Sequence, residues 1–234
     1  MTTEVTRRPT VALAFAITLC LHAGTGLAQS ANPAVPGRVE LSGGAVWFGT
    51  SAIGSRDATL TASGGGGFRL FSTASQLESA TGVHVRLGRR VTRVVEAEAS
   101  GSYVSRLLTS RIANDAENAA PAAASETTRQ FTMEGGALVR LTRWPIGSRV
   151  FPFVTAGGGY LRQLHEGGTL AQSGSLVYVG GGARIPLVSR GARQRLKQVG
   201  VRADLRALVR SGNVTLDGQS HISPALAVSL FMKF

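Results

Sequence analysis

After residue 28 the chain alternates apolar and polar positions with a period of two, and no long stretch has helical periodicity. The clearest case is 199–210, where the odd-numbered positions carry only Val, Ala and Leu, while the even-numbered positions include four charged residues. Side chains of a strand point alternately to opposite faces, so this pattern predicts strands with two unlike faces. Eight strands are predicted, at 38–49, 80–88, 94–106, 129–142, 150–163, 175–187, 198–210 and 223–234.

Two features of these strands favour a membrane barrel over a soluble β-barrel, which is the alternative. Val, Ala, Gly and Leu make up most of the apolar face, and charges concentrate on the other face, as lipid outside and a polar lumen inside require. Aromatic residues gather at both strand ends, near the long connections and near the short turns: Trp47, Tyr103, Phe131 and Tyr160, then Trp144, Phe151, Phe153 and Phe234. We predict an all-β fold, an eight-stranded antiparallel up-and-down transmembrane β-barrel over 37–234. The pattern leaves the facing of 150–163 open.

The first 28 residues have the parts of an export signal. Two arginines precede an apolar run at 11–21, which is too short to cross a membrane as a helix. Small residues precede a cleavage site after Ala28. We predict a cleaved signal peptide at 1–28 and a flexible lead-in at 29–36. The single Cys lies inside the signal, which excludes a disulfide scaffold or a cysteine-based zinc finger.

Three segments resemble the small eight-stranded outer-membrane β-barrel family, of the outer-membrane-protein-A transmembrane type. They are PFVTAGGGY at 152–160, YVGGGARIPL at 178–187 and ALAVSLFMKF at 225–234. The resemblance implies the outer membrane of a Gram-negative cell, periplasmic termini and long loops at the cell surface. Leu230, Met232 and Phe234 resemble the signal that the barrel-assembly machinery reads. Expected partners are therefore that machinery, outer-membrane lipid and an unidentified surface ligand, with the barrel itself a monomer.

An eight-stranded barrel has a lumen that side chains fill, whereas aqueous channels need about 16–18 strands. Ten charged residues are predicted to point inward, five acids and five bases, which would balance if they pair: Glu40, Arg86, Glu96, Glu98, Glu134, Arg140, Arg184, Arg202, Asp204 and Arg206. We interpret them as a packed salt-bridge plug, because buried charges are costly unless paired. A gated polar conduit, opened by exchanging partners, is the second interpretation.

The formal net charge of +12 would ordinarily suggest nucleic acid, but export makes that partner improbable. The excess of bases lies instead in the short turns, on the side expected to be periplasmic. We predict a basic rim there: Arg89, Arg90, Arg93, Arg143, Arg149, Arg190, Arg193, Arg195 and Lys197. Two interpretations stay open, contact with phospholipid headgroups and a merely solvated rim.

No catalytic, cofactor or metal site is predicted. His84 is expected to face inward near Glu96 or Glu98, and His165 and His221 lie in or beside loops. No G-x-S-x-G motif occurs, and the glycine runs lack the context of a phosphate loop. We expect a structural or surface-interaction role through the long loops at 50–79 and 107–128, with 68–71 folding back onto the rim. A narrow pore for small or apolar solutes is the alternative, and a lipid-A-modifying enzyme is third.

Overall fold

The computed structural model describes residues 38–61, 64–114, 116, 120–144, 146, 149–165, 171–189, 195–212 and 219–234. The predicted signal peptide and lead-in therefore lie outside the described residues. The described chain forms ten strands: β1 (Val39–Phe48), β2 (Ser51–Thr61), β3 (Gly67–Leu77), β4 (Ala80–Arg90), β5 (Val95–Ala113), β6 (Ala122–Arg140), β7 (Phe151–Leu164), β8 (Ala171–Ser189), β9 (Gln198–Gly212) and β10 (His221–Lys233). Within this part of the chain, no helix is long and apolar enough to cross a membrane.

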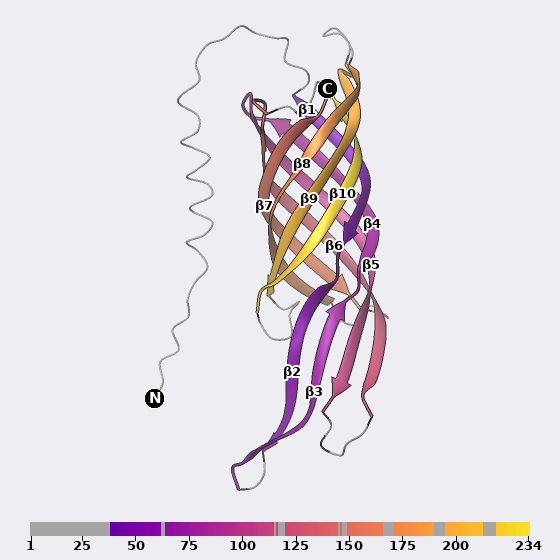
Figure 1. The fold of residues 1–234 in the computed structure, drawn as a ribbon, viewed down its shortest axis with the longest axis vertical. Coiled ribbons are helices and arrows are strands. Elements are labelled where there is room, and N and C mark those ends of the chain that lie inside the picture. Colours follow the sequence, from indigo (N-terminus) through magenta and orange to yellow (C-terminus); the bar gives the residue numbers. More distant parts are fainter. Residues whose placement is uncertain are drawn as a thin grey trace, which may run out of the picture. The chain divides into compact units, whose positions relative to one another are not determined.

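Eight of these strands close into a ring, in which every neighbouring pair is antiparallel. The order around the ring is β1, β4, β5, β6, β7, β8, β9, β10 and back to β1 (Figure 1). Backbone hydrogen bonds between Val39 and Phe234 complete the closing pair, 2.9 Å from Phe234 N to Val39 O. The predicted eight-stranded antiparallel barrel is thereby confirmed. We call the end where β1 begins and β10 finishes the terminal end, and the opposite end the hairpin end.

The long connections at 50–79 and 107–128 are mostly strands, so the prediction that they are loops was wrong. β2 and β3 form a hairpin, and residues 72–77 of β3 pair with 108–113 of β5. β5 and β6 are 19 residues long and remain paired to Ile112 and Ala122. Residues 51–61, 67–77, 107–113 and 122–128 thus form one antiparallel sheet, here called the projecting sheet (Figure 1). Its Phe71 pairs with Ala58, so 68–71 does not fold back onto the rim.

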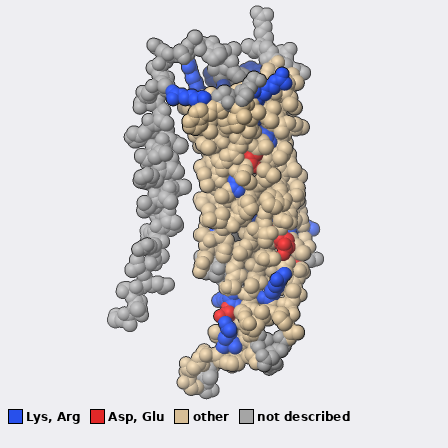
Figure 2. All heavy atoms as spheres, in the orientation of Figure 1, with Lys and Arg blue, Asp and Glu red and all other residues tan. Residues whose placement is uncertain are grey.

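The outer wall of the ring is apolar. Its exposed large hydrophobic residues include Val85, Met133, Val179 and Leu230, each at least 60% exposed. Such a surface is unfavourable in water and suits the hydrocarbon of a membrane. Most of the wall visible in Figure 2 is uncharged, and Lys and Arg are visible mainly towards its two ends.

Outward aromatic residues lie at both levels of the wall. Trp47 pairs with Leu226 on β10, whereas Phe234 follows eight residues later. At about 3.3 Å per residue and a tilt near 40°, that separation is roughly 20 Å along the barrel axis, close to the apolar band of outer-membrane barrels. Phe153, predicted for the second belt, is instead buried inside the lumen. It fixes the facing of β7, whose Tyr160 is outward.

The lumen holds two layers of side chains. Charged groups fill the part nearer the terminal end, and an apolar cluster lies towards the hairpin end, including Phe48, Leu161, Tyr178 and Leu208. The alternation had indicated a polar lumen, but apolar residues also occupy inward positions, such as Leu208 between the buried Arg206 and Arg210 along β9. Inward glycines make room for the larger rings, since a Cβ at Gly136 would collide with the Tyr178 hydroxyl.

Candidate functional site

The candidate site is the network of buried charges that crosses the lumen. Arg184, on β8, donates to three carboxylates on the other side of the barrel. Its Nη2 lies 2.8 Å from Glu40 Oε1 on β1, and its Nη1 lies 3.0 Å from Glu96 Oε2 on β5. Glu98 Oε1 is 3.3 Å from the same Nη2. One guanidinium therefore links strands on opposite sides of the ring.

Arg202 on β9 lies at the centre of this network and is fully buried. Both of its Nη atoms donate to Glu98, and its Nε lies 3.2 Å from Asp204 Oδ2. The guanidinium also stacks on the Phe153 ring, 4.5 Å from its centroid. A planar guanidinium can make hydrogen bonds in its plane and ring contacts on its face, which suits Arg to this position.

A second pair of arginines extends the network towards the apolar cluster. Arg86 Nη1 lies 3.2 Å from Asp204 Oδ2, and Arg206 Nε lies 2.7 Å from Asp204 Oδ1. Arg206 Nη1 reaches Glu134 Oε2 at 2.6 Å, and Ser100 donates to the same oxygen. Asp204 is thus held between two arginines on different strands.

The described network contains five acids and five bases, but one base differs from the prediction. Lys233 Nζ lies 3.2 Å from Glu40 Oε2 inside the lumen. Arg140, which had been assigned to the network, has no ion pair among the described residues, and its Nη2 donates to the backbone oxygen of Arg93. Alternation along β10 contains the missed signal, because Met232 and Phe234 face outward and Lys233 between them must face inward.

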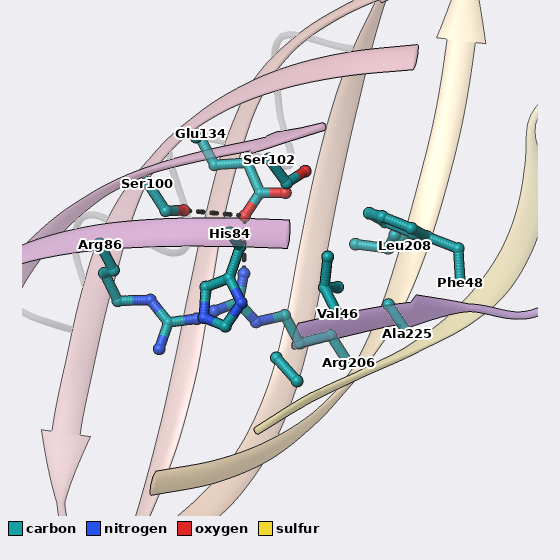
Figure 3. A pocket seen from close by; sticks show the side chains of 12 residues that line it. Val46, Phe48, His84, Arg86, Ser100, Ser102, Glu134, Arg206, Leu208 and Ala225 are labelled. Carbon is teal, nitrogen blue, oxygen red and sulfur yellow. Dashed lines mark hydrogen bonds and ion pairs between the residues drawn. The ribbon is translucent and has the colours of Figure 1, made fainter. Parts of the chain in front are cut away.

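His84 lies beside the network, in a position that differs from the prediction. It is paired in register with Ser102 rather than with Glu96 or Glu98, because the β4–β5 stagger places those acids beside Arg90 and Gly88. A cavity of about 20 Å³ separates its ring from the apolar cluster (Figure 3). Neither ring nitrogen has a hydrogen-bond partner among the described residues. The cavity is large enough for one water molecule, which would satisfy one of them.

Three carboxylates of the network have the spacing of a cation site. Oxygens of Glu40, Glu96 and Glu98 lie within 4.8 Å of one another. Arg184 donates to all three, however, so a protein cation already neutralises the cluster. We therefore interpret these three carboxylates as part of a structural ion network.

Comparison with known proteins defines the fold. No protein-family model matches the sequence, and no curated protein matches it either. Among solved structures, the outer membrane protein OprG from Pseudomonas aeruginosa aligns with a TM-score of 0.52 and 9% identity, over 85% of this chain and 96% of OprG. The fold is that of a small outer-membrane β-barrel. The attachment invasion locus protein Ail of Yersinia pestis aligns less closely, with a TM-score of 0.44 and 10% identity, over 86% of this chain and 100% of Ail.

Two buried arginines at the hairpin end of this outer-membrane-type barrel were missed as lumen residues. Arg106 donates to the backbone oxygens of Gly49, Leu77 and Glu78, at 2.6, 3.4 and 3.0 Å. It thereby holds the base of the β2–β3 hairpin, where β2 begins and β3 ends. Arg210 is also buried. The alternation that placed Glu96 and Arg202 inward continues to these two positions, so the signal was present in the sequence.

The residues predicted for the basic rim lie at the terminal end wherever the structure describes them. Arg89, Arg90 and Arg93 are at the β4–β5 turn, Arg143 and Arg149 lie between β6 and β7, and Arg195 and Lys197 precede β9. Arg190 and Arg193 lie outside the described residues. Figure 2 shows blue side chains at this end, above a wall with few charged groups.

The remaining predicted residues lie at the surface of the barrel or its hairpin end. Leu230 and Phe234 point outward, as does Met232, and their role in assembly stays a prediction. His165 Nδ1 lies 3.4 Å from Glu126 Oε1, and His221 begins β10.

Proposed function

We propose that this barrel resides in the outer membrane of a Gram-negative cell, with its terminal end in the periplasm and its projecting sheet at the cell surface. Its role is structural or interactive, and the projecting sheet performs it. The observation that supports this role is that β5 and β6 continue beyond the ring and pair there with the β2–β3 hairpin, so the barrel presents this sheet on a rigid base.

The chemistry of the projecting sheet suits water rather than lipid. Charged side chains lie within it, with Arg69 3.6 Å from Asp57 and both about half exposed. Polar cross-strand contacts hold it together, such as the 2.7 Å hydrogen bond between Ser75 and Ser110. These features differ from those of the wall and support an extracellular position.

The projecting sheet also has two open edges within the described chain. β2 pairs only with β3, and residues 122–128 of β6 pair only with β5, because the β6–β7 pairing begins at Arg129. Unpaired backbone groups at a sheet edge recognise extended segments of another chain. A partner that adds a strand is therefore the interaction this sheet supports best.

A narrow pore is the weaker candidate. The side chains of Arg184 and Arg202 cross the lumen from β8 and β9 to carboxylates on β1 and β5. The apolar cluster fills the lumen on the hairpin side of this network. Single-channel recording of the purified barrel in planar bilayers tests this point. We expect no conductance steps, and reproducible steps would favour the pore.

We propose no catalytic role. A lipid-modifying hydrolase would need a histidine hydrogen-bonded to a serine, and among the described residues neither nitrogen of His84 nor Nε2 of His165 has a hydrogen-bond partner. Mass spectrometry of lipid A, with and without expression of the protein, tests the proposal. A mass change that His165→Ala or His221→Ala abolishes would establish an enzyme.

Topology is tested by inserting an epitope tag in the β2–β3 turn after Gly65, which is exposed and has a φ of 83°. We expect antibody to label the tag on intact cells. The matched control carries the same tag after Thr92, in the β4–β5 turn, and should be labelled only after permeabilisation. The reverse pattern would invert the proposed orientation.

A further inference from the structure

A cavity with both charged and aromatic walls lies at the terminal end of the lumen. It has a volume of about 230 Å³ and lies among the ends of β6, β8 and β10 and the starts of β7 and β9. It is therefore distinct from the small cavity beside His84, which lies on the far side of the ion network.

Aromatic rings form the apolar part of its wall. Phe153 is 2% exposed and Phe231 is fully buried, so both rings are held by packing. Inward glycines lie against them: a Cβ at Gly182 would collide with the Phe153 ring, and one at Gly200 with the Phe231 ring. Rings fixed in this way make a preformed surface for an apolar group.

The polar part of the wall is cationic. Arg140, Arg184 and Lys233 line the cavity, and no Asp or Glu is among its described lining residues. Lys233 and Arg184 are paired with Glu40, although Arg184 Nε has no hydrogen-bond partner in the part of the chain that the structure describes. Arg140 is half-buried, and none of the described carboxylates forms an ion pair with it. One guanidinium is thus available for an anion.

We propose that this cavity binds a small organic monoanion, a carboxylate on an aromatic or compact alkyl body. The carboxylate would pair with Arg140, whose planar guanidinium matches two carboxylate oxygens. The body would lie against Phe153 and Phe231. A cavity of about 150 Å³ takes benzene, so 230 Å³ suits a ring with one carboxyl group. A doubly charged phosphate fits less well, because apolar walls oppose the desolvation of a second charge.

The proposal is tested with benzoate on the full barrel, refolded into lipid nanodiscs. Backbone amide chemical shifts measured by NMR report which strand ends respond, and titration calorimetry reports the affinity. Benzyl alcohol supplies the same ring without charge, and acetate supplies the charge without the ring. We expect benzoate to shift the amides of 140–142, 151, 153, 184 and 185, and we expect both control compounds to bind at least tenfold more weakly.

Two charge variants separate the cavity from the basic rim. Arg140→Met should weaken benzoate at least tenfold and leave benzyl alcohol unchanged. Arg89→Met removes one charge from the same end of the barrel but from an exposed side chain outside the cavity, and it should leave benzoate unchanged. Equal losses in the two variants would show attraction by the rim alone and overturn the proposal. So would the absence of benzoate binding, or equal binding of benzyl alcohol.

Discussion

Arg202 is the residue whose replacement tests the ion network most directly, because its side chain is fully buried among carboxylates. In Arg202→Met, Asp204 keeps Arg206 at 2.7 Å and Arg86 at 3.2 Å. Glu98 keeps only Arg184 at 3.3 Å and Arg86 at 4.0 Å. Breaking a buried ion pair by removing one partner costs ~3–5 kcal/mol. Because other arginines remain, we expect the free energy of unfolding to fall by about 3 kcal/mol, the lower limit of that range.

The assay is equilibrium unfolding in urea of the barrel refolded into lipid vesicles, followed by the fluorescence of Trp47 and Trp144, which both face outward. The double variant Arg202→Met/Glu98→Gln removes both charges and should regain most of the loss, to within about 1 kcal/mol of wild type. The reasoning would be refuted if the single variant lost less than about 1 kcal/mol, or if the double variant were as unstable as the single.

Three further variants address other parts of the barrel. Arg106→Met should speed proteolysis within the β2–β3 hairpin about tenfold, because backbone contacts at both hairpin ends are lost; the exposed Arg111→Met should not. Gly44→Ala should destabilise the barrel in urea by ~1–3 kcal/mol, because its Cβ would collide with the neighbouring backbone, whereas Gly135→Ala has open space and should be neutral. Phe234→Ala should lower the amount of barrel in outer-membrane fractions several-fold while leaving the urea midpoint of refolded protein unchanged; normal membrane levels would argue against the assembly signal.

The period-two pattern predicted the ring because each of its strands has a lipid face and a lumen face. It missed the β2–β3 hairpin because these two strands lie outside the ring. There, neither face of a strand has to be uniformly apolar or uniformly polar. At 51–61, for example, Arg56 and Asp57 are adjacent and both exposed. The turn at 64–66, rich in glycine, was the remaining signal for a hairpin.

The candidate site was predictable as a face but not as a set of contacts. Alternation decides whether a side chain enters the lumen, whereas the stagger between strands decides the height at which it meets another. For this reason Glu134 was correctly expected inward, while the partner expected for His84 was wrong. The same limit placed Arg140 in the network, because alternation gives its face but not its partners. Lys233 was a different kind of miss, since alternation along β10 already placed it inward.

The ion pair between Glu40 and Lys233 joins the first strand of the ring to the last. Arg184 and Arg202 contact the same Glu40 from 144 and 162 positions away in the chain. Contacts between residues this far apart in the sequence make folding slow. A sheet that had not yet closed would leave carboxylates and guanidiniums without their partners beside lipid. We therefore expect the charges inside this barrel to penalise insertion before the ring closes, which would make the pairing of β10 with β1 the step that commits the chain to the membrane.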